Sequence, residues 1–281
     1  MKDLDNKPNL KTKDHLVTGE KFELMYDSTM DMFITDPIPD TESLPKYYKS
    51  EAYISHSDAN KSIIDKIYQV VKRYSIAKKV TLITKENNGA GSLLDVGAGT
   101  GGFLVKAKSK GWEICGIEVN NEARNLATKK GVNLIDKFND LKDERFDVIT
   151  LWHVLEHLPD LNETIVKLNQ FLNKNGTLII AVPNFKSYDA RYYKAYWAAY
   201  DVPRHIWHFS KKAISILFKD NFKIHKTLPM IFDSFYVSLL SEKHKTGKSN
   251  FIKALFIGLR SNISAWNTKE YSSHIYILKK K

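Results

Sequence analysis

Cysteine is almost absent from this chain of 281 residues, which contains only Cys115. A single thiol excludes an internal disulfide and any metal site built from several cysteines, and its apolar neighbours predict a small buried residue. No stretch approaches about 18 consecutive apolar residues, so we expect no membrane-spanning helix. The charged start of the chain lacks the apolar segment of a secretory signal. Together these absences predict a cytoplasmic protein.

Internal repeats and low-complexity tracts are also missing, whereas the material for a globular core is present. The chain is 43% hydrophobic and 12% aromatic, which suffices to bury a core. Its net charge is +11, and +7 of this falls in the last 41 residues, where nine lysines and arginines stand against two glutamates. Such a region either forms a solvated face or attracts an anionic membrane surface. We expect no nucleic-acid partner, because the basic and aromatic strand pattern of RNA-binding modules is lacking.

The sequence changes character near residue 90. Residues 1–88 form an N-terminal extension with short β-like runs between residues 20 and 40, followed by a helical pattern of apolar residues from Ile63 to Tyr74. Residues 89–281 form a larger domain. Two segments interrupt its regular pattern, at about 183–209 and 231–268, and we interpret them as a cap over the binding site.

Strands and helices alternate in this larger domain. The expected strands are 92–97, 112–119, 146–152 and 177–182, with a weaker one at 132–135 and a final one at 271–279. The expected helices are 101–110, 120–130 and 160–173, and Gly176 is expected to end the last of these. Strands joined by crossover helices form a parallel sheet, and ligands bind at the carboxyl ends of its strands.

The strongest functional signal is the segment Leu-Leu-Asp-Val-Gly-Ala-Gly-Thr-Gly at residues 93–101. Here a buried strand runs into a turn whose glycines permit positive φ and let a ligand approach the backbone closely. Glu118 lies about 20 residues further on, where a carboxylate can accept hydrogen bonds from a ribose diol. These features predict a nucleoside-bearing cofactor, and they fit NAD as well as S-adenosylmethionine.

Other features favour S-adenosylmethionine. Asp95 lies inside the first strand, an ionisable cluster follows the strand at 146–152, and the second half of the chain does not repeat the first. Segments 95–104, 116–119, 146–157 and 176–184 resemble class I S-adenosylmethionine-dependent methyltransferases, especially the branch with ubiquinone-type O-methyltransferases. An NAD-linked oxidoreductase, and a non-catalytic cofactor-binding or RNA-associated module, are the alternatives.

The resemblance implies an α/β fold with a Rossmann-like seven-stranded sheet, its last strand antiparallel and helices on both faces. It implies that the three glycines hold the methionine part of the cofactor, that Glu118 holds the ribose and that residues 138–140 border the adenine. It also implies that the segment from Tyr47 to His56 covers the pocket. The predicted cofactor-binding residues are Asp95, Gly97, Ala98, Gly99, Gly101, Glu118, Val119, Asn139, Asp140, Trp152 and His153.

The candidate catalytic residues are His153, Glu156 and His157. If the segment is helical, the two histidines share one face, and we predict that one of them is the general base for an oxygen or carbon acceptor. A structural role beside the cofactor loop is the alternative, and the resemblance associates this position with a divalent metal. We expect no metal, because the ligand set differs here, and because Asp27 and Met30 stand where some relatives carry a cysteine pair.

The acceptor is expected to be a small amphiphilic or aromatic molecule. Its predicted contacts are Tyr200, Arg204, His205 and His208, which follow a dense run of aromatic residues. Arg204 either binds an anionic acceptor group or pairs with Asp201, and in the second case both histidines cap buried turns. Residues 250–260 are apolar with basic flanks and form a packed lid, a dimer helix or a membrane-surface helix.

Overall fold

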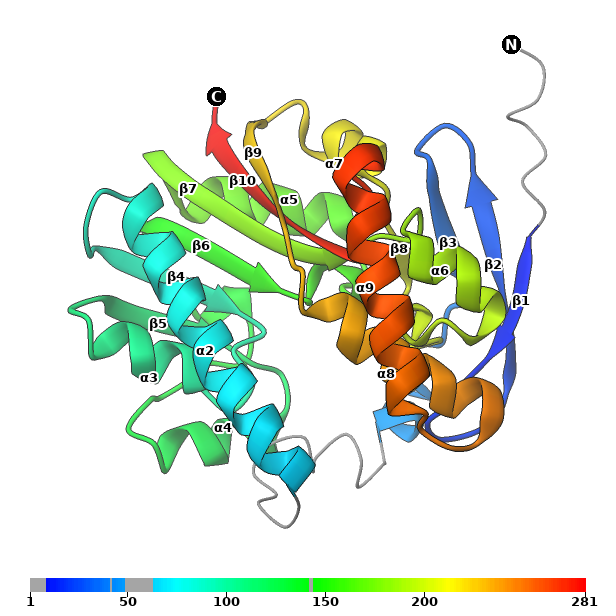
Figure 1. Ribbon diagram of the computed structural model, residues 1–281. Helices are drawn as coiled ribbons and strands as arrows, with labels where there is room; N and C mark the ends of the chain where they lie inside the picture. Colours follow the sequence, from blue (N-terminus) through cyan, green and yellow to red (C-terminus); the bar gives the residue numbers. More distant parts are fainter. Residues whose placement is uncertain (1–8, 41, 49–62, 142–143) are drawn as a thin grey trace.

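The computed structural model describes residues 9–40, 42–48, 63–141 and 144–281 (Figure 1), with the backbone alone for residues 63–68. These residues form two sheets, one of six strands and one of four. Most of the expected covering segment from Tyr47 to His56 lies outside the described residues, which include only its first two tyrosines.

The larger sheet has the order β5-β4-β6-β7-β10-β9. Its strands are β4 (Ser92–Val96), β5 (Glu113–Ile117), β6 (Phe146–Trp152), β7 (Leu172–Pro183), β9 (Phe222–Pro229) and β10 (Ser273–Lys280). The first four strands of the order are mutually parallel, and β10 is antiparallel to both its neighbours. This confirms the Rossmann-like sheet with an antiparallel last strand. The weak strand expected at 132–135 contributes only a bridge between Ile117 and Ile135, so the described sheet has six strands where seven were expected.

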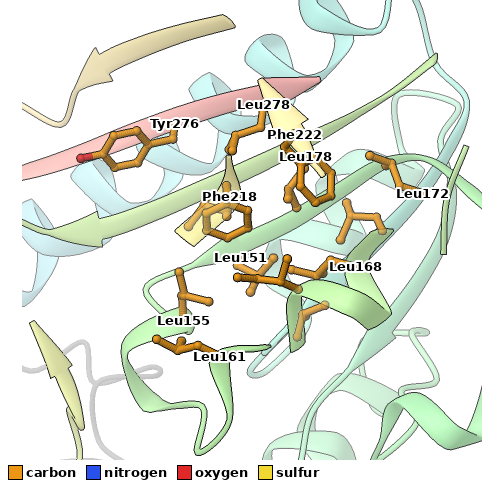
Figure 2. Packing of buried hydrophobic residues seen from close by; sticks show 14 of the residues in the cluster. Leu151, Leu155, Leu161, Leu168, Leu172, Leu178, Phe218, Phe222, Tyr276 and Leu278 are labelled. Carbon is orange, nitrogen blue, oxygen red and sulfur yellow. The ribbon is translucent and has the colours of Figure 1, made fainter. Parts of the chain in front are cut away.

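Helices cover both faces of this sheet, because its strands are apolar on both sides. The helices are α2 (Ile63–Glu86), α3 (Gly102–Lys108), α4 (Asn121–Thr128), α5 (Leu161–Phe171) and α7 (Lys211–Phe218). Along β6, Ile149 and Leu151 pack toward α5 and α7, whereas Val148 packs toward α2 and α3. Figure 2 shows the first of these layers, in which leucines of α5 and Phe218 of α7 lie against β6, β7 and β10.

Capping residues set where several helices begin. Asp160 accepts the backbone N–H of Glu163 at the start of α5, and Asn120 does the same for Ala123 in α4, which satisfies backbone donors that have no partner inside the helix. The expected end of α5 at Gly176 is wrong. The helix ends at Phe171 and the chain passes directly into β7, where a Cβ at Gly176 would lie 2.7 Å from Leu172.

The smaller sheet joins the N-terminal extension to the insertion after β7. Its strands are β1 (Leu10–Lys13), β2 (Lys21–Asp27), β3 (Met32–Asp36) and β8 (Trp207–His208), in that order. Beside it lie the short helices η1 (Leu44–Tyr48), α6 (Tyr188–Tyr193), η4 (Lys194–Tyr196) and η5 (Ala198–Tyr200). Tyr200, a predicted acceptor contact, serves as packing here: it is buried with Tyr193 and Trp197 in a cluster with residues of β2 and β3.

Two further helices precede the last strand, α8 (Asp233–Thr246) and α9 (Phe251–Thr268). They pack against each other, and both contact α6. A Cβ at Gly258 of α9 would lie 2.9 Å from the Cα of Phe235, so glycine lets the two helices approach closely. Figure 1 shows α9 on the outside of the molecule, away from the core of the larger sheet.

Candidate active site

Three glycines with left-handed backbones lie in the turn between β4 and α3. Gly97, Gly99 and Gly101 have φ values of 72°, 54° and 72°, which glycine adopts without steric strain. A Cβ at Gly97 would lie 2.4 Å from Val154, whereas nothing lies within 4 Å of a Cβ built at Gly99. Gly97 is therefore required for packing, and Gly99 presents bare backbone to open space at the carboxyl edge of the sheet.

The backbone of this turn is fixed by the neighbouring strand. The N–H groups of Gly97 and Ala98 both donate to the carbonyl of Ile117, at 2.8 and 2.9 Å. Because both donors are already used, neither N–H group is free for a ligand. Lys130 donates to the hydroxyl of Thr100 at 3.1 Å and ties the end of the turn to α4.

Glu118, which follows β5, supports the same turn with its carboxylate. One oxygen accepts a hydrogen bond from the backbone N–H of Gly99 and the other accepts one from the N–H of Asn120, each with an N–O distance of 2.8 Å. The adjacent Val119 leaves 81% of its surface exposed. A carboxylate beside an exposed apolar side chain suits a ribose diol followed by a flat base. The structure thus brings together Gly99, Glu118 and Val119 of the predicted set.

Asp95 is buried within β4, directly behind the turn. Thr150 of β6 donates its hydroxyl to Asp95 at 2.6 Å. Burial raises the pKa of Asp95 to about 7, against the opposing effects of Thr150 and of the Lys79 charge. Only 3% of the Asp95 surface is exposed, so its carboxyl lies behind the turn and is not open to direct contact.

Lys79 of α2 belongs to this region, although the sequence pattern did not single it out. Its ammonium lies 4.4 Å from the ring centroid of Trp152. Burial lowers the pKa of Lys79, while Asp95 and Asp233 act in the opposite direction. The indole N–H of Trp152 has no hydrogen-bond partner among the described residues. Lys78 beside it is exposed, and nothing in the sequence distinguishes the two lysines.

His153 adopts a left-handed backbone with φ of 58°. It lies outside the short helix η3 (Leu155–His157), so the helical face that it was expected to share with His157 is not formed. Its Nε2 lies 3.1 Å from Asp233 and its Nδ1 lies 3.4 Å from Glu156. Burial opposes the charged ring, but these two carboxylates raise the pKa of His153 to about 9. His153 is therefore a cation at neutral pH and has no free site for a proton.

Buried Glu156 and the partly buried His157 and His205 form a cluster whose possible ligand atoms lie within 4.8 Å of one another. The Nδ1 atoms of His157 and His205 lie 2.9 Å from the carbonyls of Arg204 and Ala199. Because a carbonyl can only accept, the Nδ1 of each ring carries a proton. His157, whose pKa is lowered to about 4, is neutral at pH 7 and keeps a lone pair on Nε2. Glu156 is 1% exposed, and neither of its oxygens accepts a hydrogen bond within the described part of the chain.

His157 and Glu156 of this cluster differ in their charge at neutral pH. Burial, together with the neighbouring His205, lowers the pKa of His157 to about 4. The pKa of Glu156 is also lowered, because the surrounding histidines outweigh the effect of burial. At neutral pH a neutral imidazole with a free Nε2 thus lies beside an ionised carboxylate. This pair can accept a proton, and together with His205 it offers the nitrogen and oxygen ligands that a divalent transition metal prefers.

Arg204 is committed to a buried ion-pair network. Its guanidinium donates to Asp201 at 2.6 Å, to Asp14 at 2.9 Å and to the carbonyl of Tyr47 at 2.9 Å. Only 1% of the residue is exposed. This geometry favours the second of its two predicted roles, pairing with Asp201, over contact with an anionic acceptor. Asp14 is not among the residues predicted from the sequence, because no local signal links it to Arg204, which lies 190 positions further along the chain.

The other predicted acceptor contacts are also buried. Tyr200 is 5% exposed and packs against Trp197, and His208 is 4% exposed with its Nε2 3.0 Å from the hydroxyl of Thr35. Burial lowers the pKa of His208 well below its usual range. His205 is the member of this set that lies near the candidate catalytic residues, since its ring centroid is 4.5 Å from that of His157.

The predicted adenine-bordering residues lie in the short helix η2 (Phe138–Asp140), where Asn139 and Asp140 are exposed. A hydrogen bond with Asp136 raises the pKa of Asp140 and lowers that of Asp136. The two carboxyls therefore share a proton as the pH falls. An exposed acidic pair of this kind can accept hydrogen bonds from an exocyclic amine.

Comparison with known proteins agrees with this geometry. Residues 68–226 match the model of a methyltransferase-domain family. The chain is 30% identical over 128 residues to the ubiquinone biosynthesis O-methyltransferase of Pasteurella multocida, a match that covers 38% of this chain and 52% of that protein. It is 26% identical over 125 residues to an uncharacterized methyltransferase of Alkaliphilus oremlandii, covering 42% of this chain and 58% of that protein. The chain thus spans about half the length of these relatives.

Solved structures share the fold at low identity. Magnesium protoporphyrin IX methyltransferase from Synechocystis PCC 6803, with bound SAH, superimposes with a TM-score of 0.56 at 15% identity, covering 86% of this chain and 100% of the other. Geranyl diphosphate C-methyltransferase from Streptomyces coelicolor A3(2) gives a TM-score of 0.53 at 13% identity, covering 81% and 84%. From the family match, which spans more than half of its residues, this chain belongs to the methyltransferase-domain family, and it shares its fold with these solved methyltransferases.

Proposed function

We propose that this protein transfers a methyl group from S-adenosylmethionine to a small amphiphilic or aromatic acceptor, at an oxygen or a carbon atom. The observation that carries the proposal is the bare backbone of Gly99 beside the carboxylate of Glu118. The exposed side chain of Val119 completes a surface that fits a nucleoside. The family match is to methyltransferases, which argues against the alternative of an NAD-linked oxidoreductase.

The charges around the turn suit the cofactor, which carries a sulfonium, an ammonium and a carboxylate. Glu118 places negative charge beside the glycines and Asp95, in its ionised form, places negative charge behind them. Both favour a bound cation. Lys79, stacked on Trp152, offers a partner for the cofactor carboxylate. Since methyl transfer needs an aligned approach in a dry site, the main task of these residues is to position the cofactor.

Of the two predicted bases, His157 is the better candidate. His153 is held as a cation between two carboxylates, whereas His157 is neutral with a free Nε2. A base with a pKa of about 4 is weak. However, the nearby ionised Glu156 would stabilise the imidazolium that forms when His157 takes the acceptor proton. We assign His157 as the base and Glu156 as its positioning residue.

The test is methyl transfer from labelled cofactor to a metabolite extract, with mass identification of the product. We expect label in a small molecule for the wild type, and a loss of turnover in His157→Ala with cofactor affinity near normal by calorimetry. Glu118→Ala should weaken cofactor binding on the order of 10- to 100-fold, as expected for lost hydrogen bonds to a charged group. Glu113→Ala, an exposed change at the other end of β5, is the matched control.

An unlabelled extract, or unchanged cofactor affinity in Glu118→Ala, would contradict the proposal. Full activity in His157→Ala would place the base elsewhere. In that case the ionisable cluster would serve binding or structure.

A metal-assisted reaction is the second candidate, favoured by the cluster of Glu156, His157 and His205, whose possible ligand atoms lie within 4.8 Å of one another. Neither oxygen of Glu156 accepts a hydrogen bond among the described residues, and one of them lies 3.4 Å from Nδ1 of His153. These residues fit a divalent cation, which would supply a positive charge to polarise an acceptor hydroxyl. The neutral imidazole of His157 and the ionised carboxylate of Glu156 are already in the protonation states that ligation needs. Titration of the protein with Zn²⁺ by calorimetry, compared with Glu156→Gln, separates the two candidates. Stoichiometric binding that the variant loses supports the metal.

A further inference from the structure

Helix α9 has two opposite faces of different chemistry. The side chains that it buries are small or of moderate size: Ala254, Ile257, Gly258, Ser261 and Ala265. The side chains that it exposes are large and apolar, including Ile252 at 84%, Leu255 at 62% and Trp266 at 65% exposed. An amphipathic helix of a globular protein normally shows the reverse, with its large apolar residues turned inward.

The exposed apolar residues form one continuous stripe. At 3.6 residues per turn, they fall within an arc of roughly 100° along the helix, and the buried residues lie on the opposite side. The members of this apolar stripe are Ile252, Leu255, Phe256, Leu259, Ile263 and Trp266. The stripe follows nearly the whole length of α9, so it is a surface rather than a few isolated exposed residues.

Further apolar side chains lie beside the stripe. Ile231 and Phe232, just before α8, are each 46% exposed. The side chain of Asn262 of α9 donates to the carbonyl of Ile231 at 2.9 Å and holds this segment against the helix. Tyr74 of α2, 49% exposed, contacts the Phe232 ring edge-on at 5.9 Å between centroids. The apolar surface therefore extends from α9 toward α2.

The charges around the stripe have one sign. Residues 243–269 contain six lysines and arginines and no aspartate or glutamate. Most of these basic residues are exposed, including Lys243, Lys245 and Lys248 before the helix and Arg260 along it. The acidic residues on either side are already paired: Glu242 lies 3.1 Å from Lys253, and Glu270 lies 3.2 Å from Lys211.

We propose that α9 lies on the surface of an anionic lipid bilayer, with the apolar stripe in the boundary between head groups and acyl chains. A large apolar face with Phe, Leu and Trp, flanked by Lys and Arg, is the pattern of helices that bind in the plane of a membrane. A second copy of the chain is a poorer partner for the stripe. In a symmetric dimer the basic residues around the stripe of one copy would face those of the other and repel them. None of the described helices has the length and apolar character of a membrane span. A surface position is consistent with that finding.

Co-sedimentation with vesicles tests the proposal. The full chain is mixed with vesicles of phosphatidylcholine alone, or of phosphatidylcholine with phosphatidylglycerol, at low and high salt. We expect binding to the phosphatidylglycerol vesicles that weakens with salt, since surface charges are screened. In the double variant Phe256→Ser/Leu259→Ser the partition coefficient should fall roughly tenfold or more, because two apolar side chains no longer leave water.

Matched variants guard against a folding defect. Val166→Ser on α5 changes a residue that is 60% exposed outside the stripe, and it should bind vesicles like the wild type. The fluorescence of Trp266, taken as the wild type minus Trp266→Phe, should shift to the blue on addition of anionic vesicles, whether or not the double variant folds. The proposal would be overturned by the absence of this shift, or by equal binding of the wild type to neutral and anionic vesicles. It would also be overturned by a wild-type dimer that the double variant abolishes and Val166→Ser does not.

Discussion

The Nε2 atom of His153 lies 3.1 Å from a carboxylate oxygen of Asp233, which joins the end of β6 to the first turn of α8. The same ring contacts Glu156 through Nδ1. A residue that looked like a base in the sequence therefore links the carboxyl edge of the sheet to the helices around it. Its protonation state bears on the stability of the site.

This pair predicts a loss of stability at alkaline pH. The folded pKa of His153 is about 9, above the ordinary value near 6.5. Its contribution is therefore fully present below pH ~6.5 and is lost as the pH rises through about 9. Since 34% of the side chain is exposed, screening limits the change in the free energy of unfolding to about 1–2 kcal/mol.

Urea unfolding at pH 6.5 and pH 9.5 measures this effect. Asp233→Asn should destabilise the protein mainly at the lower pH and flatten its pH dependence. Asp220→Asn, at an exposed position, should leave the dependence unchanged. A wild-type protein equally stable at both pH values would rule out the charged pair.

Asp95→Asn is expected to stabilise the protein while weakening cofactor binding. The folded pKa of Asp95 is about 7, so keeping it ionised above that pH reduces stability. A neutral amide of the same shape removes this effect and should raise the free energy of unfolding at pH 8 by about 2 kcal/mol or more. The same change removes negative charge behind the cofactor. Thermal unfolding and calorimetry with S-adenosylmethionine should move in opposite directions, and parallel losses would contradict the assignment.

Alanine at two glycines of the turn should separate packing from binding. Gly97→Ala would place a Cβ 2.4 Å from Val154, and the left-handed backbone adds strain, so we expect a loss of several kcal/mol in stability. Gly99→Ala meets no atom of the protein and should cost only about 1 kcal/mol. Its methyl group would nevertheless point into the proposed cofactor site. Equal cofactor affinity in Gly99→Ala and the wild type would show that this backbone touches no ligand.

Arg204→Met should destabilise the fold by about 3–5 kcal/mol, because it leaves the carboxylates of Asp14 and Asp201 without their buried partner. Arg204→Lys should recover little of this loss, since an ammonium cannot reproduce the geometry of the guanidinium. Denaturant unfolding measures both variants, and Arg191→Ala, at an exposed position of α6, is the control. A stable Arg204→Met protein with impaired turnover would instead restore the acceptor-binding role.

Local patterns predicted the parts of the structure that are decided locally. Short apolar runs predicted β4, β6 and β10 nearly to their ends, and glycine chemistry located the turn around Gly99. The sites that depend on distant contacts were less accessible. His153 appeared helical because its spacing to His157 fits a helix, but the ion pair with Asp233 holds it in another conformation. The position of Lys79 at the site likewise depends on the fold, which places its ammonium over the ring of Trp152.

The pairing of β3 with β8 has a practical consequence for fragment design. Strands β1 to β3, within residues 10–36, and the insertion after β7 share one sheet, and Asp14 supplies a charge that the insertion requires. A shortened version beginning at α2 would contain every strand of the larger sheet, yet it would leave a strand edge uncovered and a guanidinium without one of its counter-ions. Such a truncation is expected to aggregate, because unpaired edges associate with one another.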